Sequence, residues 1–476
     1  MKKILLITSL LFIGLLSVYA NSRKEHNAPG KNWMQYKTPE EAGWSAKKLK
    51  EANDYFKKID GSTVMLIYKG KVVVSWGNVE KDFIVASIRK VFLSSIYGKY
   101  VDNGTININD TLQDINFNDK PPLTHSERQA TIFDMLTCRS GISRKGANAE
   151  GVSIKTVNGK EVIGPKYNLP PEAKPGTVYY YSNWDFNAVG GIFKQLTGKS
   201  IFKTYYQDIA KPIGMQDFSL IDTFNLYNKK VTLYPAYNFL MSTRDMARFG
   251  LLFLNKGNWN GKQVIPKKWI KDSTKEYYKI SKTDRTGVGY FWFIFNTGFF
   301  KEHPMIQKAG TGEQVLCIFP KDDIVLVIRA NPLEKYTSKN YKYVTANEIN
   351  KLLELLINAK TQKPSKNPVF VPLKTVKSKI KVLNLNSNTY KKYIGNYKTT
   401  EKPMGAKSIK VYVNQKQLII ELLPIGVKFE LLPISENKFI IKDLNIPIDF
   451  KLNDNGKATA LKFSLKGNEF IGTKEK

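Results

Sequence analysis

The spacing of apolar residues predicts helices and strands in separate parts of the chain. Apolar positions recur every three or four residues, as on one face of a helix, in three segments: 45–55, 88–103 and 344–356. Short apolar or alternating runs bounded by turn residues are typical of strands, and they occupy six segments: 63–68, 72–76, 288–296, 304–309, 313–319 and 323–329. Between them, up to about residue 270, the pattern predicts a mixed helical and loop region.

Strands at both ends of this stretch, with helices between them, predict one antiparallel sheet built from distant segments and flanked by a helical subdomain. We therefore expect an α+β domain over residues 33–358. Lysines, prolines and asparagines dominate residues 359–381, which indicates a linker. Beyond it, period-two patterning with an Asn455-Gly456 turn predicts a small all-β barrel or sandwich over residues 382–476.

The N-terminal segment, residues 1–20, has the pattern of a secretory signal peptide. Lys2 and Lys3 precede an apolar run from Ile4 to Val18, and Ala20 is a small residue before a polar segment. The run is shorter than the roughly 20 residues that a spanning helix needs, which favours a cleaved signal over an uncleaved anchor. We therefore expect a periplasmic or secreted protein.

Composition narrows the class of protein. A chain of 476 residues with 42% hydrophobic residues is long and apolar enough for two folded domains. The formal net charge is +33, but the lysines are scattered along the whole chain and an exported protein does not meet nucleic acid. We therefore expect no nucleic-acid partner, and at most a weak association with anionic polymers of the cell envelope.

Histidines and cysteines are too few and too scattered for a metal centre. The three histidines, His26, His125 and His303, form no ligand pattern, which argues against a zinc hydrolase and against a Ser-His-Asp triad. The spacing of Cys138 and Cys317 is compatible with a disulfide and with two buried free thiols. The sequence carries no phosphate-binding glycine loop and no dinucleotide fingerprint, so we expect no cofactor.

One serine has the setting of a nucleophile. Ser87-Ile88-Arg89-Lys90 places a lysine one helical turn after the serine, so both side chains project from one face. A serine hydroxyl needs a neighbouring base, and burial near other cations lowers the pKa of a lysine until it accepts a proton.

The same S-x-x-K spacing recurs by chance in this lysine-rich chain, at Ser45–Lys48, Ser200–Lys203 and Ser378–Lys381. Only Ser87 follows a strand pair and opens a strongly apolar helix, whose N-terminus favours developing negative charge. The alternative reading of Ser87 is an ordinary helix cap.

Two further motifs follow in the chain. Tyr181-Ser182-Asn183 comes after Pro175-Gly176 and offers a phenol as a proton shuttle and an amide for a substrate's acyl group. Its alternative is a surface aromatic loop, and a second Tyr-x-Asn occurs at residues 412–414.

Lys308-Ala309-Gly310-Thr311 ends a predicted strand, along whose edge a substrate is expected to lie. The backbone N–H after Gly310, that of Thr311, would complete an oxyanion hole with the N–H of Ser87. The alternative is a lysine before a plain hairpin turn.

The ordered set S-x-x-K, Y-x-N and K-x-G resembles the serine β-lactamase and penicillin-binding-protein superfamily, most closely its class C-like and esterase branch. Residues 131–141, 212–215 and 242–250 also look like that family, and the resemblance covers roughly residues 33–358. The C-terminal module resembles the lipocalin-like appendages that such hydrolases carry.

The resemblance implies a role for each residue. Ser87 would attack a carbonyl while Lys90 and Tyr181 share the proton transfer, with either of the two as the base. Asn183 would orient the substrate, and Lys308 would favour an anionic or polar group nearby.

One residue departs from the family pattern. Ala309 stands where members that recognise β-lactams carry Thr or Ser, and its methyl group cannot bind a substrate carboxylate. A lost hydrogen bond to a charged group is worth about 1.5–3 kcal/mol, or more than about tenfold in affinity. We therefore expect a serine hydrolase acting on a small ester, amide or peptide. A β-lactamase or D-Ala-D-Ala carboxypeptidase ranks second, and a catalytically quiet peptide- or sugar-binding protein stays open.

Overall fold

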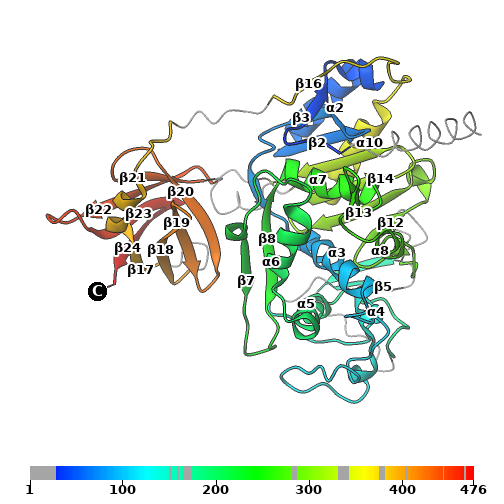
Figure 1. Cartoon of the computed structure of the whole chain (residues 1–476), viewed down its shortest axis with the longest axis horizontal. Coiled ribbons are helices and arrows are strands. Elements are labelled where there is room, and N and C mark those ends of the chain that lie inside the picture. Colours follow the sequence, from blue (N-terminus) through cyan, green and yellow to red (C-terminus); the bar gives the residue numbers. More distant parts are fainter. Residues whose placement is uncertain are drawn as a thin grey trace, which may run out of the picture.

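A computed structural model describes most of the chain: residues 28–148, 153–157, 160–164, 173–280, 287–330, 342, 344–374, 381–401, 406–442, 444–465 and 468–475. The expected signal peptide lies outside these residues. The fold is α+β, with a larger domain of sheet and helices and a separate C-terminal barrel (Figure 1).

The core of the larger domain is a nine-stranded sheet in the order β11-β12-β13-β14-β15-β2-β3-β1-β16. β15 pairs with β2 over six residues, so the two ends of the domain meet inside one sheet, as the sequence predicted. Its strands are β1 (Met34–Tyr36), β2 (Thr63–Tyr68), β3 (Lys71–Trp76), β11 (Gly287–Val288), β12 (Phe293–Phe295), β13 (Met305–Gly310), β14 (Gln314–Phe319), β15 (Ile324–Arg329) and β16 (Phe370–Pro372).

The sheet is mixed rather than wholly antiparallel. β1 runs parallel to β3, with Gln35 opposite Val72, and β16 pairs antiparallel with β1 at the edge of the sheet. The segment expected as a linker therefore contributes a strand. Tyr36 and Phe370 lie opposite each other there, with ring centroids 5.1 Å apart, so an aromatic cross-strand pair stabilises this edge in spite of its polar flanks.

The three predicted helices are present, with ends within about three residues of their patterns. Every residue of β2, β14 and β15 is buried, so these strands are covered on both faces. The helices are α2 (Ala46–Lys58), α3 (Arg89–Asp102), α4 (Ile132–Leu136), α5 (Asn183–Thr197), α6 (Ile201–Tyr205), α7 (Thr243–Leu254), α8 (Lys267–Ser273) and α10 (Ala346–Asn358).

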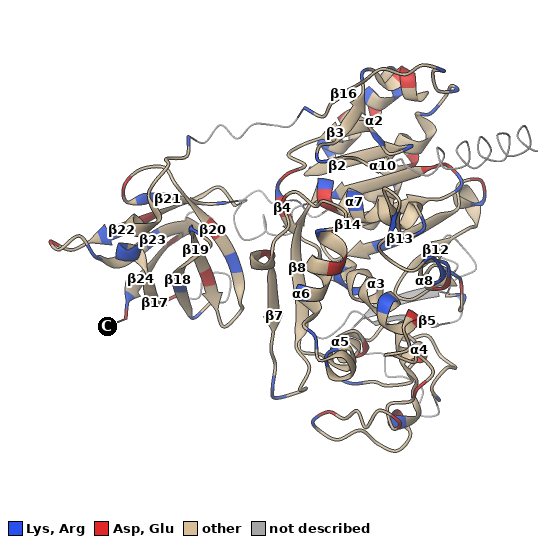
Figure 2. Ribbon diagram, in the orientation of Figure 1, with Lys and Arg blue, Asp and Glu red and all other residues tan. Residues whose placement is uncertain are grey.

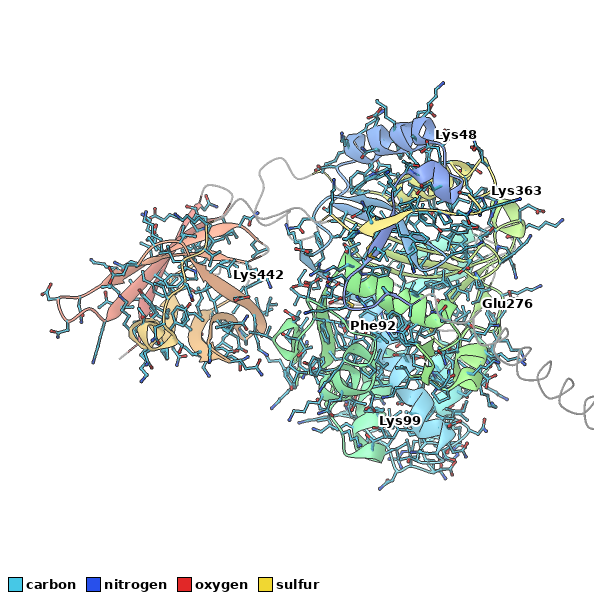
Figure 3. All side chains as sticks on the ribbon, turned by 45° about the horizontal axis from the view of Figure 1, so that its top comes forward. Lys48, Phe92, Lys99, Glu276, Lys363 and Lys442 are labelled. Carbon is cyan, nitrogen blue, oxygen red and sulfur yellow. The ribbon has the colours of Figure 1, made fainter. Side chains whose placement is uncertain are left out.

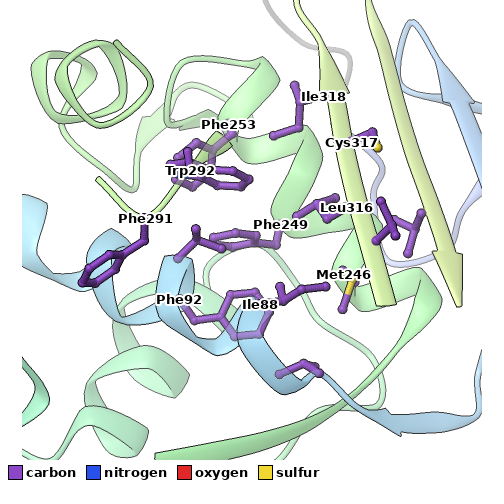
Figure 4. Packing of buried hydrophobic residues seen from close by; sticks show 14 of the residues in the cluster. Ile88, Phe92, Met246, Phe249, Phe253, Phe291, Trp292, Leu316, Cys317 and Ile318 are labelled. Carbon is purple, nitrogen blue, oxygen red and sulfur yellow. The ribbon is translucent and has the colours of Figure 1, made fainter. Parts of the chain in front are cut away.

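Helix α3 runs through the centre of the domain, and eleven of its fourteen residues are buried. Figure 4 shows Ile88 and Phe92 facing Phe249 of α7 and Leu316 of β14. The ring centroids of Phe92 and Phe249 are 4.8 Å apart, in an edge-on contact. This packing fixes the start of α3 against the sheet, where the site described below is built.

The region between residues 104 and 270 contains more strands than its pattern predicted. β8 (Ala236–Ser242) is fully buried and pairs with β4 (Asp82–Ile84) on one side and β7 (Thr223–Leu226) on the other. A short continuous apolar run cannot be told from a buried helix by periodicity. β8 pairs locally with β7 and over a long range with β4, and the second pairing has no signal within the segment itself.

The C-terminal module is a closed eight-stranded antiparallel barrel. The first and last strands close it, with Tyr397 opposite Lys474. A cavity of only about 10 Å³ lies among the apolar side chains inside, so the interior is a packed core. Its strands are β17 (Gly395–Thr399), β18 (Ser408–Asn414), β19 (Gln417–Leu423), β20 (Val427–Pro433), β21 (Lys438–Ile441), β22 (Ile446–Leu452), β23 (Ala458–Leu465) and β24 (Asn468–Lys474).

The barrel contacts the larger domain through β7 and β8. Phe224 and Leu240 from these strands belong to the same apolar cluster as Phe429 of the barrel. Lys428 Nζ donates a hydrogen bond to the carbonyl of Thr223 at 3.1 Å. Apolar burial and a polar contact therefore hold the two domains together.

Basic residues are spread over both domains rather than gathered on one face (Figure 2). Figure 3 shows Lys48, Lys99, Lys363 and Lys442 in separate parts of the molecule. Among the described residues no helix has the length and apolar character to cross a membrane.

Candidate active site

Ser87 lies where a short strand meets the central helix. β4 leads into a single 3-10 turn (Ala86–Ile88), and α3 begins directly after it. Ala86 has a φ of 48°, a left-handed conformation that is strained for a residue with a side chain. The sharp turn leaves Ser87 half-buried at the start of α3, where the helix dipole favours negative charge on its oxygen.

Lys90 holds the centre of the site. Its side chain is buried, with 1% of the residue exposed. Lys90 Nζ lies 2.7 Å from Ser87 Oγ and 2.5 Å from Tyr181 Oη. The structure therefore brings together the serine, the lysine and the phenol of the first two sequence motifs.

The surroundings disfavour a charge on this lysine. Burial lowers the pKa of Lys90 well below its ordinary value, and the neighbouring cations Arg89 and Lys308 lower it further. Above this lowered pKa the amine is neutral and has a free electron pair. Burial raises the pKa of the Tyr181 phenol, so Tyr181 stays protonated at neutral pH.

Tyr181 is positioned by the loop before α5. The backbone N–H of Tyr180 donates to the carbonyl of Cys138 at 2.8 Å, which anchors the loop one residue earlier. The Tyr181 ring packs edge-on against Phe186, with centroids 4.7 Å apart. The phenol is thereby aimed at Lys90.

Asn183 is the first residue of α5 and is half-buried. One turn later on the same helix face, Asn187 Oδ1 accepts a hydrogen bond of 2.9 Å from Arg89. This contact joins α5 to α3 directly beside Lys90. The role of Asn183 toward a substrate stays a prediction.

Lys308 is also buried, with 1% exposure, and its Nζ donates to the carbonyl of Phe291 at 2.6 Å. The same Nζ lies 5.4 Å from the centroid of the Tyr181 ring. The positive charge of Lys308 therefore lies inside the protein, close to the Tyr181 ring.

Gly310 brings the end of β13 against the backbone of the nucleophile. A Cβ atom at this position would lie 2.5 Å from the carbonyl oxygen of Val85 and 3.0 Å from the amide nitrogen of Ser87. Only a residue without a side chain permits this approach. Thr311 follows directly and is exposed, and the predicted oxyanion role of its N–H stays a prediction.

Sequence reasoning missed two aromatic residues of the site. The Phe186 ring centroid lies 4.2 Å from Lys90 Nζ, and the carbonyl of Phe291 binds Lys308. Phe186 lies three residues after Asn183, so helical spacing would have indicated it. Phe291 has a φ of 67°, which no sequence pattern signals for a phenylalanine.

Two of the chance S-x-x-K motifs are helix caps. Ser45 accepts a hydrogen bond from the N–H of Lys48 at the start of α2, and Ser200 accepts one from Lys203 at the start of α6. The third motif begins outside the described residues. The position of Ser87 after a strand and before an apolar helix therefore distinguished it from the helix-cap serines that share the S-x-x-K spacing.

A cavity of about 630 Å³ lies between α5 and the β7–β8 hairpin. Asn187 and Tyr237 line it, and both also contact Arg89, since the guanidinium lies 4.3 Å from the Tyr237 ring centroid. The cavity therefore backs onto the residue next to Lys90.

Within the described part of the chain, no group of three or more His, Cys, Asp or Glu side chains is arranged to hold a metal ion. Cys138 and Cys317 are both buried free thiols. The chemistry that this site offers is nucleophilic, because Lys90 Nζ, an amine of lowered pKa, contacts both a hydroxyl and a phenol.

Comparison with known proteins places the site in a family context. A family model described as Beta-lactamase matches residues 49–350. An uncharacterized protein of Alkalihalophilus pseudofirmus is 24% identical over 316 residues, which is 59% of this chain and 87% of that protein.

Protein flp of Staphylococcus aureus (strain NCTC 8325) is 21% identical over 336 residues, which is 61% of this chain. The chain spans only 64% of the length of protein flp. Among solved structures, a candidate beta-lactamase from Bacteroides dorei DSM 17855 is similar with a TM-score of 0.50 and 13% identity. The match covers 67% of this chain and 100% of that one, and shows the fold alone.

Proposed function

The chain belongs to the Beta-lactamase family, and we propose that it is an exported serine hydrolase that forms an acyl-enzyme on an ester or amide carbonyl. The observation that carries the proposal is the position of Lys90 Nζ, between Ser87 Oγ at 2.7 Å and Tyr181 Oη at 2.5 Å. A binding protein has no need for a buried lysine held between a hydroxyl and a phenol.

In the proposed first step, neutral Lys90 takes the proton of Ser87 while Oγ attacks the carbonyl carbon. The lowered pKa of Lys90 supports this choice of base, and the raised pKa of Tyr181 argues against a phenolate at neutral pH. Tyr181 then relays a proton from Lys90 to the leaving group. Loss of the leaving group produces the acyl-enzyme on Ser87, and water releases the acid by the reverse proton path.

The negative charge that develops on the carbonyl oxygen needs donors. The amide of Ser87 and that of Thr311 are proposed to supply them, and the close approach of Gly310 to Ser87 supports this pairing. The buried ammonium of Lys308 has a separate role in this proposal: its positive charge helps to keep Lys90, the proposed base, uncharged.

Position 309 argues for a substrate without a carboxylate at the β13 edge. Ala309 offers no hydroxyl that could donate to such a carboxylate. Esters and simple amides therefore rank above β-lactams and D-Ala-D-Ala peptides. A β-lactamase or peptidase remains the second candidate because Lys308 and Gly310 of the K-x-G motif are both in place.

The test is whole-protein mass measurement after exposure to a fluorophosphonate and, separately, to a labelled penicillin. We expect a fluorophosphonate adduct on Ser87 that is absent in Ser87→Ala. If neither reagent forms an adduct on folded protein, the proposal that this protein is a serine hydrolase is refuted. Turnover of a short-chain nitrophenyl ester against that of nitrocefin then ranks the two substrate classes.

A further inference from the structure

A second surface feature of the larger domain lies apart from Ser87, Lys90 and Tyr181. It is a groove of about 590 Å³ between the end of α7, helix α8 and strand β13. Its floor is apolar and consists of Phe253, Leu254, Ile270, Ile306 and Pro320. Its volume is in the range of sites that hold small organic ligands, about 300–1,000 Å³.

The rim of this groove is basic. Lys256, Lys267, Lys268 and Lys271 line it, and no acidic residue within the described part of the chain does. All four lysines are exposed, and Lys268 pairs with Asp272 at 2.6 Å. Figure 2 shows the lysine positions of α8 in blue.

Two of these lysines carry like charges at helical spacing. Lys267 and Lys271 are four residues apart on α8, so their charges lie on one face of a seven-residue helix. A like-charge pair at this spacing destabilises a helix, and an anion bound between the two would remove the repulsion. An apolar floor beside such a pair matches a molecule with an anionic head and an apolar tail.

We propose that this groove binds a long-chain fatty acid, with its carboxylate between Lys267 and Lys271 and its alkyl chain along the floor. The complementarity of charge and of apolar surface selects this occupant. Each methylene group that the floor covers should strengthen binding by about fourfold, since burial of one CH₂ has that effect on a binding constant. The inference does not depend on the hydrolase activity.

The experiment uses the full chain and a dansyl-labelled undecanoic acid, followed by fluorescence. We expect saturable binding, with laurate and then palmitate displacing the probe at successively lower concentrations. Lys267→Glu combined with Lys271→Glu should weaken probe binding at least tenfold. Leu254→Asn should weaken it while leaving the lysines in place.

The matched control combines Lys398→Glu with Lys410→Glu, two exposed lysines on neighbouring strands of the barrel. It makes the same change in net charge and should leave binding unchanged, with all variants checked for folding by circular dichroism. Equal weakening in this control would overturn the proposal, as would displacement by dodecyltrimethylammonium as effective as by laurate. Binding to anionic vesicles without saturable binding of the probe would also overturn it, in favour of a membrane surface.

Discussion

The backbone of Gly310 lies so close to Ser87 that a Cβ atom at position 310 would be 3.0 Å from the Ser87 amide nitrogen. The same atom would be 2.5 Å from the carbonyl oxygen of Val85, and backbone atoms of a packed turn have little room to shift. The end of β13 therefore packs directly against the turn that carries Ser87, and it can do so because position 310 has no side chain.

Replacement of this glycine is expected to impair catalysis, and circular dichroism checks that the variant folds. Gly310→Ala should lower kcat/KM for a nitrophenyl ester at least about tenfold, because it displaces the Ser87 amide from the proposed oxyanion hole. Gly30→Ala is the matched control, since a Cβ there meets nothing within 4 Å. Unchanged ester turnover by folded Gly310→Ala would contradict the proposed donor pair.

Lys90 is expected to be the proton acceptor. Lys90→Ala should slow acylation by about 100-fold or more, a typical effect of losing an acid–base group. The rate is read from the burst of nitrophenol release. Lys48→Ala removes the lysine of a chance S-x-x-K motif on α2 and should leave the burst unchanged. Matching rates for wild type and Lys90→Ala would exclude the lysine as the base.

The pH profile should report the lowered pKa of Lys90. Only the neutral amine accepts a proton, so kcat/KM is expected to rise as pH increases through that pKa and then level. Lys308→Met removes a cation that lowers the pKa of Lys90, so this rise should move to higher pH. Lys99→Met changes an exposed lysine on α3, the helix that carries Lys90, and should leave the pH profile unchanged. A shift to lower pH in Lys308→Met would contradict the electrostatic role.

Both thiols are expected to be inert in the native protein. Cys138 and Cys317 are buried, and burial raises the pKa of each thiol to about 12, so almost no thiolate exists at pH 8. Ellman's reagent should detect no thiol in the native protein and two after denaturation. Fast reaction of either thiol in folded protein would show that its site opens.

The barrel should be dispensable for the chemistry. Removal of residues 382–476 leaves the contact between Ser87, Lys90 and Tyr181 intact, so ester turnover should stay measurable. The truncation exposes Phe224 and Leu240, which favours aggregation, and Phe224→Ser is added to limit it. Complete loss of acylation by a folded truncate would show that the barrel shapes the site.

Local patterns predicted much of the fold. Apolar periodicity located α2, α3 and α10 to within a few residues, and alternation with turn residues predicted an all-β C-terminal module. These elements carry their signal within a few consecutive residues. β8 and β16 did not, because each pairs with a segment far away in the chain, β8 with β4 and β16 with β1.

For the site, the sequence by itself determined that Ser87 and Lys90 share one face of a helix start, because a spacing of three residues is about one helical turn. It could not determine that Tyr181, 91 residues beyond Lys90, reaches the same nitrogen. Nor could it determine that Lys90 is buried beside Arg89 and Lys308, which together with burial lower its pKa. Only the tertiary structure decided these points, because desolvation and charge proximity arise from segments that meet in space and not along the chain.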